Sequence, residues 1–405
     1  MKQRNVLTSL LLAGAMLLSA CGAPAASSAP AVSAAPASSD AALSPSEQWA
    51  LDNGLDKTET PEELYKKALA AGGEVNIYTV SGRMQRVKEA FEKDYPGMTL
   101  VVHDMNVNEL LEKYNREYEA GIHTADVIHL KEQTGEILKE YVQTGMMHNY
   151  HPSDIYGKVD EKFLALTPMY FEADWWYFNT EVYKESPIDS WWDLTRPEWK
   201  GKFLCVDPMS DIGYMALLTT IIENSDLMAK AYEEEFGTPI VLAADEPDAG
   251  HAFLKRFAQN RPVFETSSNG VVKAVGASGQ SDPPVGYAVS SKLRERDEQG
   301  YPLGVDPLNF KPAVGIYGMN IVEIADGAPN PDGAKLVVRY LAGEADGNGN
   351  GFAPYNTVGG WSIRRDGPSA KGNVPFEEVK TFPQDMEYTY QHIKEVQDYW
   401  VSVQP

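Results

Sequence analysis

The sequence predicts an α/β protein built as two lobes, and three observations support that prediction. The chain has 405 residues, which is too many for one ordinary hydrophobic core. Strand patterns alternate with amphipathic helix patterns from residue 60 onward. Two long extended stretches, residues 167–179 and 312–324, interrupt this alternation. We therefore expect two mostly parallel sheets flanked by helices, with the extended stretches crossing between them as a hinge.

The two crossings define the expected lobes. Residues 60–174 and 313–405 form lobe 1, and residues 175–312 form lobe 2. A chain that leaves one lobe, builds a second one and then returns has the architecture of a two-lobed clamp.

The first 20 residues have the parts of a secretory signal. Lys2 and Arg4 provide a basic start, and residues 6–18 form an apolar run too short to span a bilayer. The run ends in Leu-Ser-Ala-Cys at residues 18–21, which resembles the lipobox of bacterial lipoproteins. We therefore expect residues 1–20 to be a lipoprotein signal peptide, cleaved before a lipidated Cys21. An ordinary secretory signal is the alternative.

Residues 21–46 are expected to be the lipidated cysteine and a flexible tether, because they are mostly Ala, Pro and Ser without any period. The protein would then be lipid-anchored on the extracellular face of the cell membrane, in an envelope of the Gram-positive type. Cys205 is the one other cysteine and lies in an apolar run. A single thiol forms no internal disulfide, so we expect a small buried hydrophobic residue.

The composition bounds the partners of the protein. Hydrophobic residues make up 43% and charged residues 23% of the chain, as in soluble globular proteins. The formal net charge of −23 opposes binding to nucleic acid and to anionic membrane surfaces. It does not exclude a small anionic ligand, since a cleft has a local field of its own.

The elements of lobe 1 begin with a helix at Thr60-Pro61, where a capping residue precedes a proline at the first helical position. Residues 74–80 alternate as a strand, which Ser81 and Gly82 end. Ser81 is a suitable N-cap for the amphipathic helix that follows. The further expected elements are a strand at 99–103, a helix at 108–120, a strand at 125–128 and a helix at 132–143.

The turn at residues 81–83 is the first candidate ligand site. In an open α/β sheet, ligands bind outside the carboxyl ends of the strands. Free N–H groups at a helix N-terminus favour an anion, and Arg83 adds a forked donor. In the alternative interpretation Ser81 only caps the helix and Arg83 is solvated, an exposed side chain with little effect on stability.

Lobe 2 shows a second series of α/β units. The aromatic crossing at 167–179 contains Trp175, Trp176 and Tyr177, whose side chains alternate in direction if the segment is extended. We expect one side to line the cleft and the other to fill the core. The expected elements are strands at 203–206 and 284–289, helices at 210–224, 226–236, 248–260 and 291–298, and, after the second crossing, helices at 330–341 and in the tail at 387–403.

Three segments carry a family resemblance. Residues 192–202 (WDLTRPEWKGK), 77–83 (IYTVSGR) and 327–335 (GAPNPDGAK) resemble segments of periplasmic solute-binding proteins of type II, in the branch that contains ferric-iron, sugar-phosphate and polyamine binders of ABC importers. The resemblance covers roughly residues 74–343. It implies a two-lobed binding protein that captures a small polar solute and delivers it to an ABC permease.

The resemblance leaves the ligand open. Iron-binding members carry an adjacent Tyr-Tyr pair, and the comparable residues 267–275 contain no tyrosine. Polyamine-binding members use carboxylates and tryptophans, for which Asp207, Asp211, Trp175 and Trp176 are candidates. Our leading ligand is a phosphorylated or otherwise anionic organic solute, because Ser268 and Asn269 open a second helix much as Ser81 and Gly82 open the first. Ferric iron and polyamine remain the alternatives.

The expected ligand-binding residues come from both lobes, and no catalytic or metal-binding residue is among them. No nucleophile elbow, zinc-protease motif or phosphate-binding loop occurs. His148 and His151 fall in an expected loop, and residues 346–351 match half of a calcium loop but lack its final glutamate. The expected ligand-binding residues are Tyr78, Ser81, Gly82, Arg83, Trp175, Trp176, Asp207, Asp211, Ser268, Asn269, Tyr287 and Tyr317.

We accordingly expect a monomeric binding protein, not an enzyme, that uses no cofactor. Two functions of another class remain as alternatives, a secreted hydrolase and a ligand-sensing partner of a membrane kinase.

Overall fold

The computed structural model describes residues 43–405, so the expected signal peptide, Cys21 and most of the tether lie outside the described residues. The expected tether extends too far, because helix α1 (Pro45–Asp52) begins inside it. Ser44 caps this helix in a capping box with Glu47. Within residues 43–405, no helix is long and apolar enough to cross a membrane.

Three parallel strands form the first part of the sheet, as the sequence predicts. Strand β1 (Glu74–Thr79) lies between β2 (Thr99–Asp104) and β3 (Val127–Glu132). Alternate residues of β1 enter different cores, since Ile77 packs with α2 and α3, and Tyr78 packs with α4. These helices are α2 (Pro61–Ala70), α3 (Met84–Asp94) and α4 (Val107–Glu119).

The segment after β3 differs from the prediction. The strand runs on to Glu132, and the helix is a π-helix, η1 (Ile137–Val142), that starts later than expected. The Glu132 carboxylate accepts backbone N–H groups of Thr134 at 2.6 Å, Gly135 at 2.8 Å and Ile137 at 2.8 Å. This carboxylate holds a tight turn where a helical pattern suggested a continuous helix.

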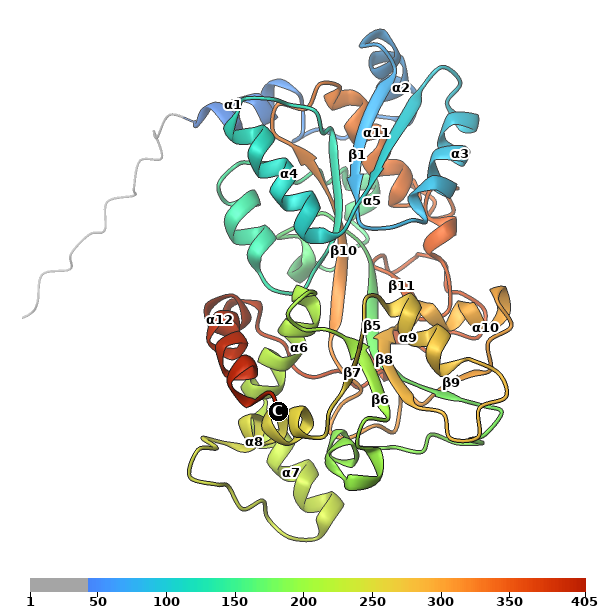
Figure 1. Cartoon of the computed structure of the whole chain (residues 1–405). Helices are drawn as coiled ribbons and strands as arrows, with labels where there is room; N and C mark the ends of the chain where they lie inside the picture. The colour runs from blue at the N-terminus through green and yellow to red at the C-terminus, as the bar shows by residue number, and fades with distance from the viewer. Residues whose placement is uncertain (1–42) are drawn as a thin grey trace, which may run out of the picture. The chain divides into compact units, whose positions relative to one another are not determined.

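The two crossing stretches are strands β5 (Pro168–Asn179) and β10 (Tyr317–Ala325), which pair with each other in antiparallel fashion (Figure 1). Strand β10 is also antiparallel to β3, and β5 is antiparallel to β8 (Val285–Val289). The complete sheet is therefore mixed and not mostly parallel, because the chain reverses at each crossing. Its path is β2-β1-β3-β10-β5-β8-β6-β7.

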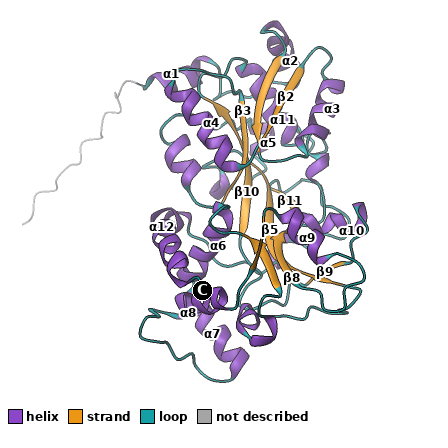
Figure 2. Ribbon diagram, in the orientation of Figure 1, coloured by secondary structure: helices purple, strands orange, loops and turns teal. Residues whose placement is uncertain are grey.

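The last part of the path is again parallel, with β6 (Phe203–Val206) between β7 (Val263–Glu265) and β8. Helices α6 (Ile212–Glu223), α7 (Ser225–Phe236), α8 (Ala249–Gln259) and α9 (Ser268–Val275) accompany these strands (Figure 2). The expected helix at 291–298 is divided into a 3-10 helix, η5 (Ser290–Arg294), and a short α10 (Glu295–Glu298).

The C-terminal part of the chain returns to both groups of helices. Helix α11 (Pro331–Leu341) packs on α2. Helix α12 (Met386–Val403) packs on α6 and α8, although the prediction grouped residues 313–405 with lobe 1. The remaining short elements are β4 (Met147–His148), α5 (Ser153–Tyr156), η2 (Glu161–Phe163), η3 (Trp191–Thr195), η4 (Pro197–Trp199), β9 (Leu303–Val305), η6 (Ala353–Tyr355), β11 (Gly360–Ser362) and η7 (Phe376–Glu378).

Residues singled out for metal or thiol chemistry have ordinary structural contacts. Cys205 is buried in β6, as expected, and burial raises the pKa of its thiol. The His148 Nε2 lies 2.8 Å from Asp326 Oδ1, whereas the His151 Nε2 lies 2.9 Å from the Leu166 carbonyl oxygen. Within residues 43–405, no group of three or more His, Cys, Asp or Glu side chains is arranged to hold a metal.

Candidate ligand-binding cavity

A cavity of about 890 Å³ lies between the two parallel parts of the sheet. The ends of strands and the starts of helices from both parts line it. Its walls include the turn after β1, the turn after β3 and the start of α4. The opposite wall contains the starts of α6 and α9 and the segment after β8. The floor comes from β5 through Tyr170, Glu172 and Asp174. This is the position at which open α/β sheets bind ligands.

The Arg83 side chain is buried at the edge of this cavity, and the expectation of an exposed turn arginine is wrong. Its side chain is 14% exposed, and its Nη2 donates to Glu172 Oε1 at 2.8 Å and to the Tyr170 hydroxyl at 3.0 Å. The guanidinium carbon lies 4.7 Å from the ring centroid of Tyr355. Its Nη1 is buried and donates to no protein acceptor among the described residues.

The carboxylate partner of Arg83 is held in its charged form. Burial raises the pKa of Glu172, but the nearby Arg83 and Lys131 cations outweigh burial and bring the pKa down to about 2. Arg83 and Glu172 therefore form a buried ion pair of the kind that is costly to break from one side.

Ser81 lines the cavity but does not cap the helix, which corrects the sequence prediction. Helix α3 begins at Met84, and Arg83 occupies the N-cap position without a side-chain cap. The Met84 N–H instead donates to the Ser81 carbonyl oxygen at 2.9 Å. Gly82 and Arg83 also line the cavity, at the positive end of the helix dipole.

The α-helices α3, α4, α6 and α9 begin at this cavity. Helix α9 starts at Ser268, as predicted, and Ser267 caps it by accepting the Gly270 N–H at 3.2 Å. The first N–H groups of a helix, here those of Ser268 and Asn269, have no intrahelical acceptor. Helix α6 is capped by Asp211, whose Oδ1 accepts the Gly213 N–H at 2.9 Å.

Lys292 is a cavity residue that the sequence analysis missed. It lies just after β8, next to the floor strand, because the Ala173 N–H donates to the Ser290 hydroxyl at 3.1 Å. Burial, together with the Arg294 and Arg83 cations, lowers the pKa of Lys292 to about 8. Lys292 takes part in none of the ion pairs formed within residues 43–405, whereas Arg294 pairs with Glu295 at 3.4 Å. The sequence signal that could have identified Lys292 as a cavity residue was its position just after the end of an expected strand.

Asp174 is a second missed residue, two positions along β5 from Glu172. It is 6% exposed, and its Oδ2 accepts from Lys131 Nζ at 3.2 Å and from Gln133 Nε2 at 3.5 Å. Its Oδ1 receives no hydrogen bond from the described residues. Burial raises the pKa of Asp174 against the effect of Lys131. A carboxylate inside a run of aromatic residues was the signal for this position.

Six of the expected ligand-binding residues lie outside this cavity lining. Both tryptophans fill the core, with Trp175 at 6.1 Å from the Trp361 ring and Trp176 at 5.4 Å from the Trp191 ring. The expected division into a cleft side and a core side does occur along β5, since Tyr170, Glu172 and Asp174 line the cavity, but both tryptophans lie outside that lining. The six residues are Tyr78, Trp175, Trp176, Asp207, Tyr287 and Tyr317.

Of the six expected residues outside the lining, the four that are not tryptophans make contacts within the fold. The Tyr78 hydroxyl donates to Glu117 Oε2 at 2.7 Å, and Asp207 Oδ1 accepts the Met209 N–H at 2.9 Å. The Tyr287 ring packs 5.2 Å from that of Trp176, and the Tyr317 ring 5.4 Å from that of Phe171.

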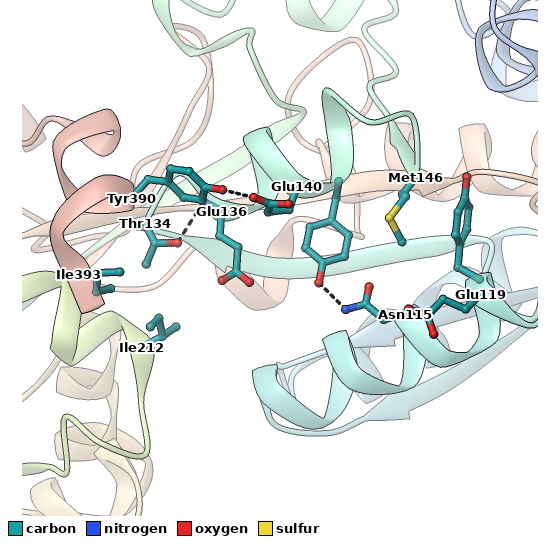
Figure 3. Close-up of a pocket in the computed structure, with 11 residues that line it drawn as sticks. Asn115, Glu119, Thr134, Glu136, Glu140, Met146, Ile212, Tyr390 and Ile393 are labelled. Carbon is teal, nitrogen blue, oxygen red and sulfur yellow. Dashed lines mark hydrogen bonds between the residues drawn. The ribbon is translucent and has the colours of Figure 1, made fainter. Parts of the chain in front are cut away.

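A second cavity, of about 640 Å³, lies between α4, η1 and α12 (Figure 3). It shares Thr134, Glu136 and Ile212 with the first cavity. Its lining, as far as residues 43–405 form it, contains carboxylates and tyrosines but no lysine or arginine. Two of its walls are linked by Tyr390, whose hydroxyl donates to Glu140. The starts of α3, α4 and α9 and the Arg83 and Lys292 side chains line the first cavity, which is therefore the candidate site.

Comparison with known proteins identifies one matching family model. The model described as "Bacterial extracellular solute-binding protein" matches residues 86–350. No curated protein matches the sequence significantly.

Solved structures share the fold of this chain. The apo ferric ion-binding protein A of Pasteurella haemolytica has a TM-score of 0.61 at 17% identity, over 82% of this chain and 98% of that one. AfuA of Actinobacillus pleuropneumoniae, with fructose-6-phosphate bound, has a TM-score of 0.60 at 19% identity, with 82% and 98% covered. Iron-bound HitA of Pseudomonas aeruginosa has a TM-score of 0.61 at 13% identity, with 82% and 99% covered. The predicted two-lobed fold of type II is confirmed.

Proposed function

This chain belongs to the bacterial extracellular solute-binding proteins, and on that premise we propose that it captures a small anionic organic solute and delivers it to an ABC permease. The solute occupies the 890 Å³ cavity above β5. Binding occurs without chemical turnover, and the chain acts as a monomer.

One observation supports an anionic ligand: the N-termini of α3, α4, α6 and α9 converge on a cavity that also contains unpaired cationic donors. Helix N-termini offer N–H groups and the positive end of a dipole to an anion. The Arg83 Nη1 has no protein acceptor, and Lys292 has no ion pair within residues 43–405. An anion would satisfy both the Arg83 Nη1 donor and the Lys292 ammonium, whereas a ferric ion or a polyamine would satisfy neither.

Ferric iron is further disfavoured by the tyrosines of the cavity. The lining tyrosines are Tyr170 and Tyr214, which come from different segments. The Tyr170 hydroxyl accepts from Arg83 at 3.0 Å, and the Tyr214 hydroxyl donates to the Tyr287 carbonyl oxygen at 2.9 Å. Neither is a free phenol, and burial raises the pKa of both hydroxyls well above the usual value.

We propose that capture occurs by closure of two lobes about β5 and β10. The lobes are residues 60–174 with 313–385, and residues 175–312 with helix α12, which packs on α6 and α8. A ligand that contacts both walls gains contacts only when the walls approach each other, so it shifts the population toward the closed form.

We further propose lipid anchoring at Cys21 on the extracellular face of the membrane, in a Gram-positive type of envelope. Substitution Cys21→Ser is expected to release the protein from the membrane fraction. A Cys21→Ser protein that stays in that fraction with unchanged mobility would contradict the anchor.

The ligand class is tested with the purified protein and a thermal-shift panel of sugar phosphates, alkylphosphonates, spermidine and ferric citrate, with isothermal titration of each compound that stabilises it. We expect the phosphate or phosphonate compounds to raise the melting temperature. A shift with spermidine or ferric citrate alone would contradict the anionic ligand and leave the fold assignment intact.

A further inference from the structure

The cavity is not uniformly positive, which restricts the kind of anion that suits it. In the described part of the chain, its lining contains five cationic side chains and six carboxylates. A ligand with negative charge alone would therefore meet an excess of carboxylates. The cations are Arg83, Arg86, Lys131, Lys292 and Arg294, and the carboxylates are Glu132, Glu136, Glu172, Asp174, Asp211 and Glu298.

The free positive charge gathers at one end of the cavity. Arg83 and Lys292 are near enough that each cation affects the other, since Arg83 is among the causes that lower the pKa of Lys292. Glu172 neutralises one face of Arg83 through Nη2, and Nη1 stays without a protein acceptor. This end of the cavity can accept a phosphate, phosphonate or carboxylate group.

An excess of negative charge lies at the other end, because Asp174 pairs with Lys131 through Oδ2 at 3.2 Å and Asp211 forms no ion pair within residues 43–405. Asp174 is 6% exposed and uses only Oδ2 for protein hydrogen bonds, so Oδ1 is an acceptor available to the cavity. Asp211 lies close by, because it is among the charges that raise the pKa of Asp174. The start of α6 is packed tightly here, since a Cβ built on Gly213 would lie 2.4 Å from Gln133 Oε1 and 3.2 Å from Asp211 Oδ1.

The spacing of the two ends follows from strand geometry. Glu172 and Asp174 lie two residues apart on β5, and both line the cavity. At 3.2–3.4 Å of rise per residue, the two positions are separated by about 7 Å. Arg83 is paired with the first carboxylate, so a short ligand can reach the positive end and the negative end at once.

We propose that the ligand is a short zwitterion, with its anionic group at Arg83 and Lys292 and an ammonium group at Asp174 and Asp211. This inference rests on the proposed function and narrows its ligand class. The ammonium accounts for the free Asp174 Oδ1, and the anionic group accounts for the free Arg83 Nη1 and the unpaired Lys292.

Three matched probes separate the two ends by isothermal titration of the purified protein. Phosphoethanolamine carries both charges, ethyl phosphate lacks the ammonium, and ethanolamine lacks the phosphate. We expect phosphoethanolamine to bind roughly ten- to a hundredfold more tightly than ethyl phosphate, as for one charge-assisted contact. Ethanolamine should bind more weakly than both.

Two variants assign the ammonium end. In Asp174→Asn, affinity for phosphoethanolamine should fall to that for ethyl phosphate, with ethyl phosphate binding unchanged or slightly tighter. Asp211→Asn is the second variant, because asparagine retains the helix cap. Asp207→Asn is the matched control, since Asp207 lies on the same segment but outside the lining, and all three affinities should stay as in the wild type.

The outcomes distinguish failure of the zwitterionic ligand from failure of the anionic ligand. Equal affinities for phosphoethanolamine and ethyl phosphate, or equal losses for both in Asp174→Asn, would overturn the zwitterion and keep the anionic ligand. Binding of ethanolamine alone, or of no probe, would overturn both.

Discussion

The turn after β1 and the segment after β8 both bring a cation to the cavity, but they hold it differently. Arg83 is clamped by Glu172, Tyr170 and the Tyr355 ring, so it belongs to the core as much as to the site. Lys292 has no such clamp. The comparison shows that Arg83 belongs to the buried framework of the cavity, whereas Lys292 forms no ion pair within residues 43–405 and is the cation that our proposal assigns to the ligand.

Loss of Arg83 should produce the largest effect. Arg83→Ala leaves the buried Glu172 carboxylate unpaired, and removing one partner of a buried ion pair costs about 3–5 kcal/mol. The unfolding free energy from urea titration should fall by that amount, and anion affinity should fall as well. Arg83→Lys should recover only part of both, because it lacks the forked geometry. Unchanged stability in Arg83→Ala would show that Arg83, like Lys292, does not stabilise the fold.

Arg83→Ala should also change how the unfolding free energy depends on pH at acid pH. Glu172 has a pKa of about 2 in the folded protein, below its ordinary value of 4.5. Its contribution is therefore present above pH 4.5 and lost as the pH falls through about 2. In Arg83→Ala this contribution should vanish, so the wild-type and variant unfolding free energies should converge toward low pH. Parallel curves would contradict the pairing.

Trp176→Ala should separate stability from binding. Trp176 packs against Trp191 and Tyr287 in the core, and removal of a buried tryptophan costs about 3–5 kcal/mol. Trp175→Ala should lose a similar amount. Titration of the folded variants should give ligand affinities close to that of the wild type, in contrast to Arg83→Ala. A selective loss of affinity in either tryptophan variant would return that side chain to the site.

Lys292→Met should weaken ligand binding without a loss of stability, which is the reverse of the result expected for the tryptophan variants. A charge-assisted hydrogen bond contributes about 1.5–3 kcal/mol, so affinity for the anionic group should fall roughly ten- to a hundredfold. The unfolding free energy should stay the same or rise slightly, since Lys292 forms no ion pair within residues 43–405. Calorimetric titration and urea unfolding measure the two effects on the same sample. A large loss of stability would show that Lys292 is structural like Arg83.

The smallest expected effect is on the alkaline pH dependence of binding. The pKa of Lys292 is lowered to about 8, and its charged form binds the anion, so affinity should decline as the pH rises from 7 through 9. The groups that set this pKa are Arg294, Arg83, Glu172 and Glu295. Lys292→Arg should flatten the profile, because arginine stays charged in this range. An identical profile in Lys292→Arg would assign the titration to another group.

The segments that carried the family resemblance identify the fold better than the ligand. The Trp192 Nε1 donates to the Met228 carbonyl oxygen at 2.9 Å, deep in the core. The Asn330 side chain caps α11 by accepting the Gly333 N–H at 3.0 Å, and the Asn330 backbone N–H donates to Asp126 Oδ1 at 2.6 Å. In this chain these residues hold elements of the fold together and line no part of the candidate cavity, so they predicted strands, helices and their order.

The site was only partly accessible from the sequence. Ser81, Arg83, Ser268 and Asn269 line the candidate cavity, and they were predicted because they follow a strand end or open a helix, which are local patterns. Asp174 and Lys292 were missed because they come together through the antiparallel pairing of β5 with β8, in which Asp174 lies opposite Val289. Hydrophobic periodicity gives the burial of a strand but not its neighbour in the sheet.

Helix α12 joins the two walls of the cavity from outside. It packs on α6, whose first residues line one wall, and Glu387 in its first turn pairs with Lys139 at 2.6 Å, on η1 beyond the other wall. Relative movement of the walls must therefore stretch or break this contact. The pair is partly exposed, and such pairs contribute about 0–1 kcal/mol. The Tyr390 hydroxyl adds a hydrogen bond from the same helix to Glu140 on η1. If the walls close on a solute as we propose, the C-terminal helix acts as a brake on reopening and lengthens the stay of a captured molecule without touching it.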